Sequence, residues 1–177
     1  MPLQTKRAKK LLQLEQYENS NVRMINDEAA VKFVKQNIQK IGKLAPVYLH
    51  KDFHSGNLIY TNNGEIGVID FNRWEVGDPY EDFYKLESFG IEKSILYCVG
   101  QIDEYFNDKT PLDFWEILAV YVAHRSLYSI KWAEKFGNKQ LEGMKKRCKA
   151  TFANYDNFNK VVLSWYDKSL RLKYVNK

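Results

Sequence analysis

The apolar residues in the first part of the chain recur with a helical period. Four of them lie three or four residues apart: Ala30, Val34, Ile38 and Ile41. At this spacing they form one apolar stripe along a helix. Asn26 is suited to cap the start of that helix, and Gly42 is suited to end it.

After Pro46 the pattern changes to short, strand-like runs. Residues 47–49 form the first, and residues 58–61 form a second before the turn-forming triplet Asn62-Asn63-Gly64. Residues 65–71 read as the return strand of a β-hairpin. The sequence therefore predicts a small hairpin in an otherwise helical chain.

The rest of the chain is predicted to be helical. Asp78, followed by Pro79, is typical of a helix N-terminus with proline at its first position, and Glu81 adds a first-turn carboxylate. We expect Gly90 to end this helix. Further helices are expected over residues 91–106, from Thr110-Pro111 to about Phe136, and onward to Tyr174. The predicted class is α+β, mainly α-helical.

Charged residues are distributed unevenly along the chain. The net charge is +5, with nine basic and four acidic residues in 1–49, three and eight in 50–90, and fifteen and ten in 91–177. An acidic middle segment suits a site that collects a divalent cation, and lysines mostly remain on solvated faces. We therefore expect neither a nucleic-acid nor a membrane partner.

Two further features concern the cellular environment. No apolar run approaches the ~20 residues that span a bilayer, and the first residues lack the apolar region of a secretory signal. A cytoplasmic location is expected. Cys98 and Cys148 are too few and too far apart for a disulfide framework, and we interpret them as reduced thiols.

The segment richest in chemical groups runs from His50 to Asp70. His50, Asp52 and Asn57 form the pattern H-x-D-x-x-x-x-N, and Asp70 follows the Asn by thirteen residues on the predicted hairpin. A kinase-type site needs a carboxylate to orient a hydroxyl and accept its proton, and hard oxygen ligands for Mg²⁺. This spacing indicates phosphoryl transfer from ATP or GTP to a hydroxyl.

Residues 47–86 resemble the catalytic core of the aminoglycoside phosphotransferase and choline kinase group, relatives of protein kinases. The residues that carry the resemblance are His50, Asp52, His54, Gly56, Asn57, Ile69-Asp70-Phe71, Gly77-Asp78-Pro79 and Asp82. The resemblance implies that Asp52 is the catalytic base and that Asn57 and Asp70 bind Mg²⁺ and thereby the nucleotide. It also implies that Asp82 braces the loop.

Other residues of the motif receive more limited roles. We expect His50 to act in the catalytic loop by orienting it through hydrogen bonds rather than by titrating, and His54 to support the loop. Asp78 has a sufficient explanation as a helix cap. Lys51 departs from the small residue common in this group, and Asn72 stands where protein kinases have glycine.

The first lobe of such kinases is not recognisable here. No glycine precedes Gly42, so no glycine-rich phosphate loop can be drawn, and the early apolar pattern is helical. The resemblance therefore covers a C-terminal lobe only, with the N-terminal nucleotide-gripping lobe absent. We expect a fragment, a split form completed by that lobe or by self-association, or a protein that works without it.

One kinase-like C-terminal lobe is accordingly expected over residues 1–177, since 45% apolar composition suffices for one core. Its parts are leading helices (1–46), a catalytic loop and metal-binding hairpin (47–90) and a helical substrate-side subdomain (91–177). The expected acceptor is a small-molecule hydroxyl of unassigned identity. The basic balance of residues 91–177 disfavours a polycationic antibiotic.

Two other functions stay open at this point. If residues 50–54 formed a strand, His50, Asp52 and His54 would share one face and could bind a metal for a hydrolase. Alternatively, the chain is a non-catalytic lobe that acts as a binding or interaction module. The aromatic residues Trp115, Tyr121, Tyr128 and Trp132 lie at helical spacings and are expected in the core, and His124 is expected to be a core or surface histidine.

Overall fold

A computed structural model describes residues 3–170 of the chain. Its regular elements, in chain order, are α1 (Leu3–Glu18), α2 (Glu28–Asn37), β1 (Val47–Leu49), β2 (Leu58–Tyr60), β3 (Ile66–Val68), β4 (Glu75–Gly77), α3 (Ile95–Tyr105), α4 (Leu112–Ala133) and α5 (Asn138–Asn154). Single 3₁₀ turns follow α2 and α4. The chain is therefore mainly helical with small antiparallel sheets, as expected for the α+β class.

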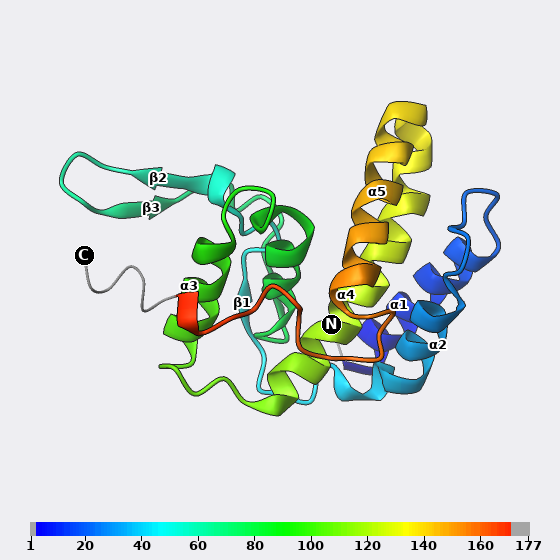
Figure 1. The fold of residues 1–177 in the computed structure, drawn as a ribbon, viewed down its shortest axis with the longest axis horizontal. Helices are drawn as coiled ribbons and strands as arrows, with labels where there is room; N and C mark the ends of the chain where they lie inside the picture. The colour runs from blue at the N-terminus through cyan, green and yellow to red at the C-terminus, as the bar shows by residue number, and fades with distance from the viewer. Residues whose placement is uncertain (1–2, 171–177) are drawn as a thin grey trace.

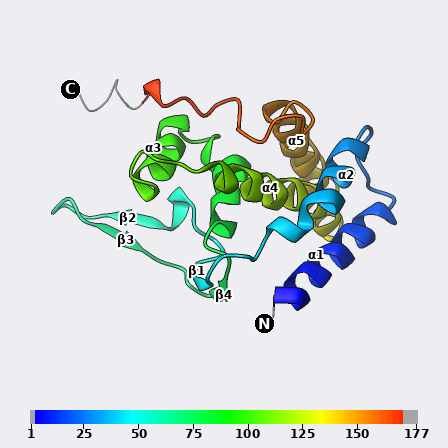
Figure 2. The same cartoon turned by 90° about the horizontal axis from the view of Figure 1, so that it is seen from below.

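Helix α4 is the centre of the molecule. Figure 2 shows it crossing the middle, with α1, α2 and α5 packed around its C-terminal half. Because neighbours cover it on several sides, buried residues occur all round it, among them Leu118, Leu127 and Ile130. The leading helices and the last long helix therefore share one core with the segment that carries the motif.

Two small antiparallel sheets carry the middle of the chain. Strand β1 pairs with β4, with Leu49 opposite Glu75, and β2 pairs with β3, with Leu58 opposite Val68. The β2–β3 hairpin projects from the helical body (Figure 1). The predicted hairpin is confirmed, but its return strand is shorter than the expected 65–71, because the chain turns at Asp70, whose φ is +64°.

The start of α2 differs from the prediction by one residue. Asn26 adopts φ +63°, and Asp27 stands at the N-cap. Asp27 is fully buried and accepts hydrogen bonds from Tyr17 Oη and from the Arg23 guanidinium, each at 2.5 Å. Its carboxylate thus joins α1 to α2. Helix α2 ends at Asn37, earlier than expected, and a 3₁₀ turn over Ile38–Lys40 separates it from Gly42, whose φ is +65°.

The final helix is shorter than expected. Helix α5 ends at Asn154, and Asp156, Asn157 and Phe158 all have positive φ, which a continuing helix does not allow. Tyr174, where the last helix was expected to end, lies outside the described residues. No helix within residues 3–170 has the length and apolarity needed to cross a membrane.

Asp78 has the structural role that was predicted for it. One carboxylate oxygen accepts from Tyr80 N (3.0 Å) and the other from Gly42 N (2.6 Å). It therefore fixes both the start of the next helical segment and the chain after α2. That segment is irregular, with a 3₁₀ turn at Glu81–Phe83 and a wider π-helical turn at Leu86–Gly90.

Candidate active site

The carboxylate of Asp82 holds the backbone of residues 50–57, which we call the motif loop. It accepts hydrogen bonds from His50 N (2.8 Å) and Lys51 N (3.0 Å). Burial raises the pKa of Asp82 above its usual value, although these two N–H groups oppose the shift. The contacts are those of a bracing residue, the role implied by the resemblance.

The backbone conformation at Lys51 is one that favours a residue with a small side chain or none. Its φ is +67°, a conformation that is costly for a residue with a side chain. Here the side chain is held by two carboxylates, with Lys51 Nζ 2.9 Å from Glu75 and 2.8 Å from Glu81. These ion pairs offset the backbone cost of the departure.

Hydrogen bonds join the motif loop to the base of the hairpin. Asn57 Nδ2 donates to Asp52 O (2.9 Å), and Ile69 N donates to Asn57 O (3.0 Å). His50 Nδ1 accepts from Asp52 N (3.2 Å), so His50 Nε2 carries the proton and donates to Ile69 O (2.8 Å). Both ring nitrogens of His50 are therefore engaged in holding the loop, as an orienting histidine requires.

The Asp52 carboxylate lies among three cationic or titratable side chains. Lys85 Nζ is 2.6 Å from Oδ1, Arg73 Nη1 is 3.6 Å from Oδ2, and His54 Nε2 is 3.8 Å from Oδ1. Burial alone would raise the pKa of Asp52, but the hydrogen bond and charge of Lys85, with Arg73 and His54, lower it overall. Asp52 is therefore ionised at neutral pH.

Sequence reasoning missed Lys85 and Arg73. Lys85 lies three residues after Asp82 in the same helical segment, so both side chains reach the loop from adjacent turns. Once Asp82 is assigned to the loop, the three-residue spacing predicts that Lys85 reaches the loop as well. Arg73 lies in the turn after Asp70, where the sequence carries no comparable signal.

Asn57 and Asp70 lie at the same end of the hairpin. Asp70 directly follows Ile69, which is hydrogen-bonded to Asn57, and its exposed carboxylate accepts from Asn72 Nδ2 (2.8 Å). Because Asn57 Nδ2 is used by Asp52 O, Asn57 Oδ1 is the atom left to bind a cation. One amide oxygen and one carboxylate are hard ligands of the kind Mg²⁺ prefers.

The alternative metal site is not formed. Residues 50–54 are bends and irregular backbone rather than a strand. The ring nitrogens of His50 face Asp52 N and Ile69 O, and His54 Nδ1 accepts from Gly56 N at 3.0 Å. Within the described part of the chain, no group of three or more His, Cys, Asp or Glu side chains is placed to hold a metal ion.

Glu81 is a first-turn carboxylate, as expected, and it is also the centre of a buried ionic cluster. It is 2% exposed, and its Oε1 lies 2.9 Å from Lys10 Nζ, 2.8 Å from Lys51 Nζ and 3.5 Å from Arg125 Nη2. Burial would raise the pKa of Glu81, but the three cations hold it far below its usual value. Burial also lowers the pKa of Lys10 to about 8.

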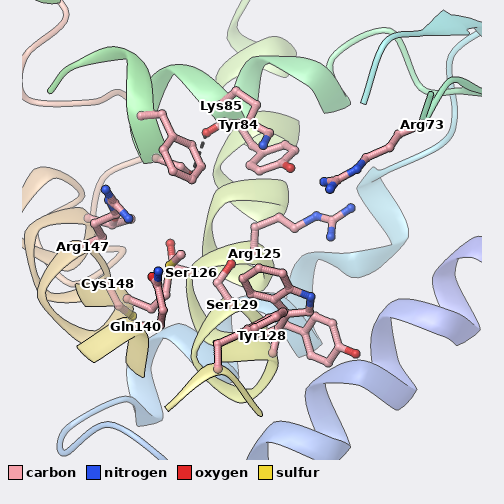
Figure 3. A pocket seen from close by; sticks show the side chains of 16 residues that line it. Arg73, Tyr84, Lys85, Arg125, Ser126, Tyr128, Ser129, Gln140, Arg147 and Cys148 are labelled. Carbon is pink, nitrogen blue, oxygen red and sulfur yellow. Dashed lines mark hydrogen bonds between the residues drawn. The ribbon is translucent and has the colours of Figure 1, made fainter. Parts of the chain in front are cut away.

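A cavity of about 530 Å³ opens beside Lys85 and Arg73 (Figure 3). The helical segment 81–90, α4 and α5 form its walls. Tyr128 and Trp132 were expected in the core, but they line this cavity instead. Trp115, Tyr121 and His124 are buried, in agreement with the prediction.

Comparison with known proteins defines the class of protein. A model of the phosphotransferase enzyme family matches residues 2–115, which is more than half of the chain and includes both helices before the motif. The chain belongs to this family, and the predicted relationship to the aminoglycoside phosphotransferase and protein-kinase-like group is confirmed. Searches of curated proteins and of solved structures found no match.

Proposed function

We propose that the chain is a small-molecule kinase that transfers the γ-phosphoryl group of ATP or GTP to a hydroxyl, within a kinase-like C-terminal lobe. The observation that carries this proposal is the set of hydrogen bonds joining Asp52, Asn57 and Ile69, which gathers a candidate base and two candidate metal ligands at the base of one hairpin. Family membership supports the same class of reaction.

In the proposed reaction, the acceptor hydroxyl donates a hydrogen bond to Asp52. The hydroxyl oxygen bonds to the γ-phosphorus, the bond from that phosphorus to the bridging β,γ-oxygen breaks, and the hydroxyl proton passes to Asp52 and then to solvent. Lys85 holds Oδ1, so Oδ2 is the oxygen available to the hydroxyl. Because the pKa of Asp52 is low, its main contribution is orientation of the hydroxyl.

Asn57 and Asp70 are the residues that fit a magnesium site. A bound Mg²⁺ would neutralise charge on the nucleotide phosphates. The left-handed backbone of Asp70 is tolerated by aspartate and asparagine better than by most residues. It allows the chain to leave β3 and place the carboxylate at the hairpin base.

An apolar face adjoins this site. A second cavity of about 520 Å³ is lined by Tyr48, Leu49, His50, Phe53, Val68, Phe71, Trp74 and Asp82. Trp74 and Tyr48 are largely exposed on it, at 58% and 80%. Since Phe71 directly follows Asp70, a nucleotide-gripping lobe docked here would reach the metal ligands, and we propose such a lobe as the occupant. Sedimentation of the chain alone distinguishes this from pairing of two copies.

A non-catalytic binding lobe is the second candidate. Residues 3–46 contain helices α1 and α2 and, as far as they are described, no strand pair that could cover phosphates. The measurement that decides between the candidates is nucleotide binding.

Calorimetric titration with Mg-ATP, using Asp70→Asn and Asp156→Asn, tests the proposal. Both aspartates are exposed and have positive φ, +64° and +50°, so both substitutions keep a residue that tolerates this backbone. We expect magnesium-dependent binding that is lost in Asp70→Asn and unchanged in Asp156→Asn. Equal binding by both variants, or none by the folded parent chain, would contradict an assembled magnesium-nucleotide site.

A further inference from the structure

The cavity beside Lys85 is positively charged. Its described lining contains four basic side chains and no aspartate or glutamate. The complete lining is Arg73, Tyr84, Lys85, Ser88, Phe89, Arg125, Ser126, Tyr128, Ser129, Trp132, Phe136, Gln140, Met144, Arg147, Cys148 and Thr151. A ligand carrying several positive charges would therefore be repelled.

Two of the four cations already have strong partners. Lys85 Nζ is 2.6 Å from Asp52, and the Arg147 guanidinium makes two hydrogen bonds with Glu92, at 2.8 and 3.1 Å. Their charges are largely balanced by these carboxylates. The positive charge available to a ligand therefore comes from Arg73 and Arg125.

Arg125 is the less satisfied of these two arginines. Its Nη2 lies 3.5 Å from Glu81, and that carboxylate is already paired more closely with Lys10 and Lys51. Its Nε is buried and has no hydrogen-bond partner among the described residues. An arginine has five N–H donors, and leaving buried ones unpaired is costly.

Figure 3 shows the guanidinium groups of Arg73 and Arg125 directed toward one another. Arg73 reaches in from the loop after Asp70, is 69% exposed, and lies 3.6 Å from Asp52. Two facing guanidinium groups repel one another unless an anion lies between them. The two side chains therefore put positive charge at the Asp52 end of the cavity.

The remaining walls are rich in aromatic rings. Tyr84, Phe89, Tyr128, Trp132 and Phe136 line the cavity, and the Arg125 guanidinium lies over the Tyr84 ring, 5.1 Å from its centroid. Such walls favour a flat apolar body by burial and ring contact. The volume of about 530 Å³ is large enough for one substituted ring.

We propose that this cavity binds an aromatic compound carrying an anionic group. Arg125 binds the anionic group, with Arg73 closing over it, and the aromatic walls hold the ring. This inference goes beyond the proposed kinase function. Binding of the anionic compound does not depend on that function.

Three matched probes test the charge requirement: 4-hydroxyphenylacetate, tyramine and 4-hydroxyphenethyl alcohol, which share a hydroxyphenyl ring and carry negative, positive and no charge. Titrated into the full chain, the anion is expected to bind about tenfold or more tightly than the others, since charge-assisted hydrogen bonds contribute about that much. Equal affinity of the three probes, or preference for tyramine, would overturn the proposal.

Variants locate the site. Arg125→Gln and Arg73→Gln are expected to weaken binding of 4-hydroxyphenylacetate about tenfold. Lys149→Gln, which removes one charge from an exposed α5 position outside the cavity, is expected to leave it unchanged. Arg73 is exposed, so its variant remains informative if Arg125→Gln does not fold. Equal weakening in all three variants would mean nonspecific attraction and would overturn the site.

Two further titrations separate this inference from the kinase proposal. Asp70→Asn is expected to bind 4-hydroxyphenylacetate normally even though Mg-ATP binding is lost. Saturating Mg-ADP is expected not to displace the anion. Displacement by Mg-ADP would assign the cavity to the nucleotide and overturn this site, while leaving the proposed kinase function intact.

Discussion

Asp52→Asn is expected to lower the rate of phosphoryl transfer by about 1,000-fold, while Mg-ATP affinity stays within about twofold because Asn57 and Asp70 are unchanged. The amide lacks the negative charge that orients the hydroxyl and accepts its proton, and it removes the negative partner of Lys85, which lies 2.6 Å from Asp52 Oδ1. The measurement is the initial rate with an acceptor found by screening small-molecule alcohols, together with calorimetry for the nucleotide.

The matched control is Lys85→Met. It removes the other half of the ion pair but keeps the Asp52 carboxylate. If Asp52 acts on the hydroxyl, Lys85→Met retains more activity than Asp52→Asn. If both variants lose activity equally, the pair acts only as a structural contact. A near-normal rate in Asp52→Asn would remove Asp52 from the reaction altogether.

The pH dependence adds an independent check on Asp52. Because Lys85, Arg73 and His54 hold its pKa below the usual value, Asp52 stays ionised from neutral pH down to mildly acidic pH. Its titration therefore contributes no loss of activity near neutrality, and the acidic limb lies below about pH 4. In Lys85→Met the pKa of Asp52 should rise, which moves that limb to higher pH.

The motif segment was predictable because its interactions are local. Asp52, Asn57 and Asp70 lie within nineteen residues, and the turn Asn62-Asn63-Gly64 aligns β2 with β3. Pairing across a short hairpin then places Ile69 opposite Asn57 without reference to the rest of the fold. Errors at this level were limited to element ends, such as the early exit from β3 at Asp70.

The charge environment of the site was not predictable in the same way. Glu81 meets Lys10 across 71 positions of sequence, and no periodicity or spacing links the two residues. The cavity likewise needs the segment 81–90, α4 and α5 to meet. Tyr128 and Trp132 keep the spacing of core residues, and only the placement of α5 shows that they face a cavity.

Glu81→Gln is expected to lower the free energy of unfolding by about 3–5 kcal/mol, the usual cost of removing one partner from a buried ion pair. Glu81 and Lys10 are 2% and 8% exposed, so the lost carboxylate leaves buried cations without their shared anion. The cluster joins α1, the motif loop and α4 through Lys10, Lys51 and Arg125. Urea unfolding followed by circular dichroism measures the change.

Glu75→Gln is the matched control, because Glu75 also pairs with Lys51 but its carboxylate is 42% exposed. Solvent screening limits its expected cost to about 1 kcal/mol or less. Similar small losses in both variants would mean that the buried cluster contributes no more than a surface pair. Loss of folding in Glu81→Gln alone would agree with the expected ranking.

The pH dependence of the free energy of unfolding tests whether the ionised carboxylate of Glu81 is what stabilises the fold. The folded-state pKa of Glu81 lies far below its unfolded value, so the stabilisation is complete above the unfolded pKa, about 4.3, and is lost as pH falls below it. The stability difference between the parent chain and Glu81→Gln should therefore be constant from pH 7 to about 5 and shrink toward pH 3. A difference that stays constant down to pH 3 would show that the ionised carboxylate of Glu81 is not what stabilises the joint between α1, the motif loop and α4.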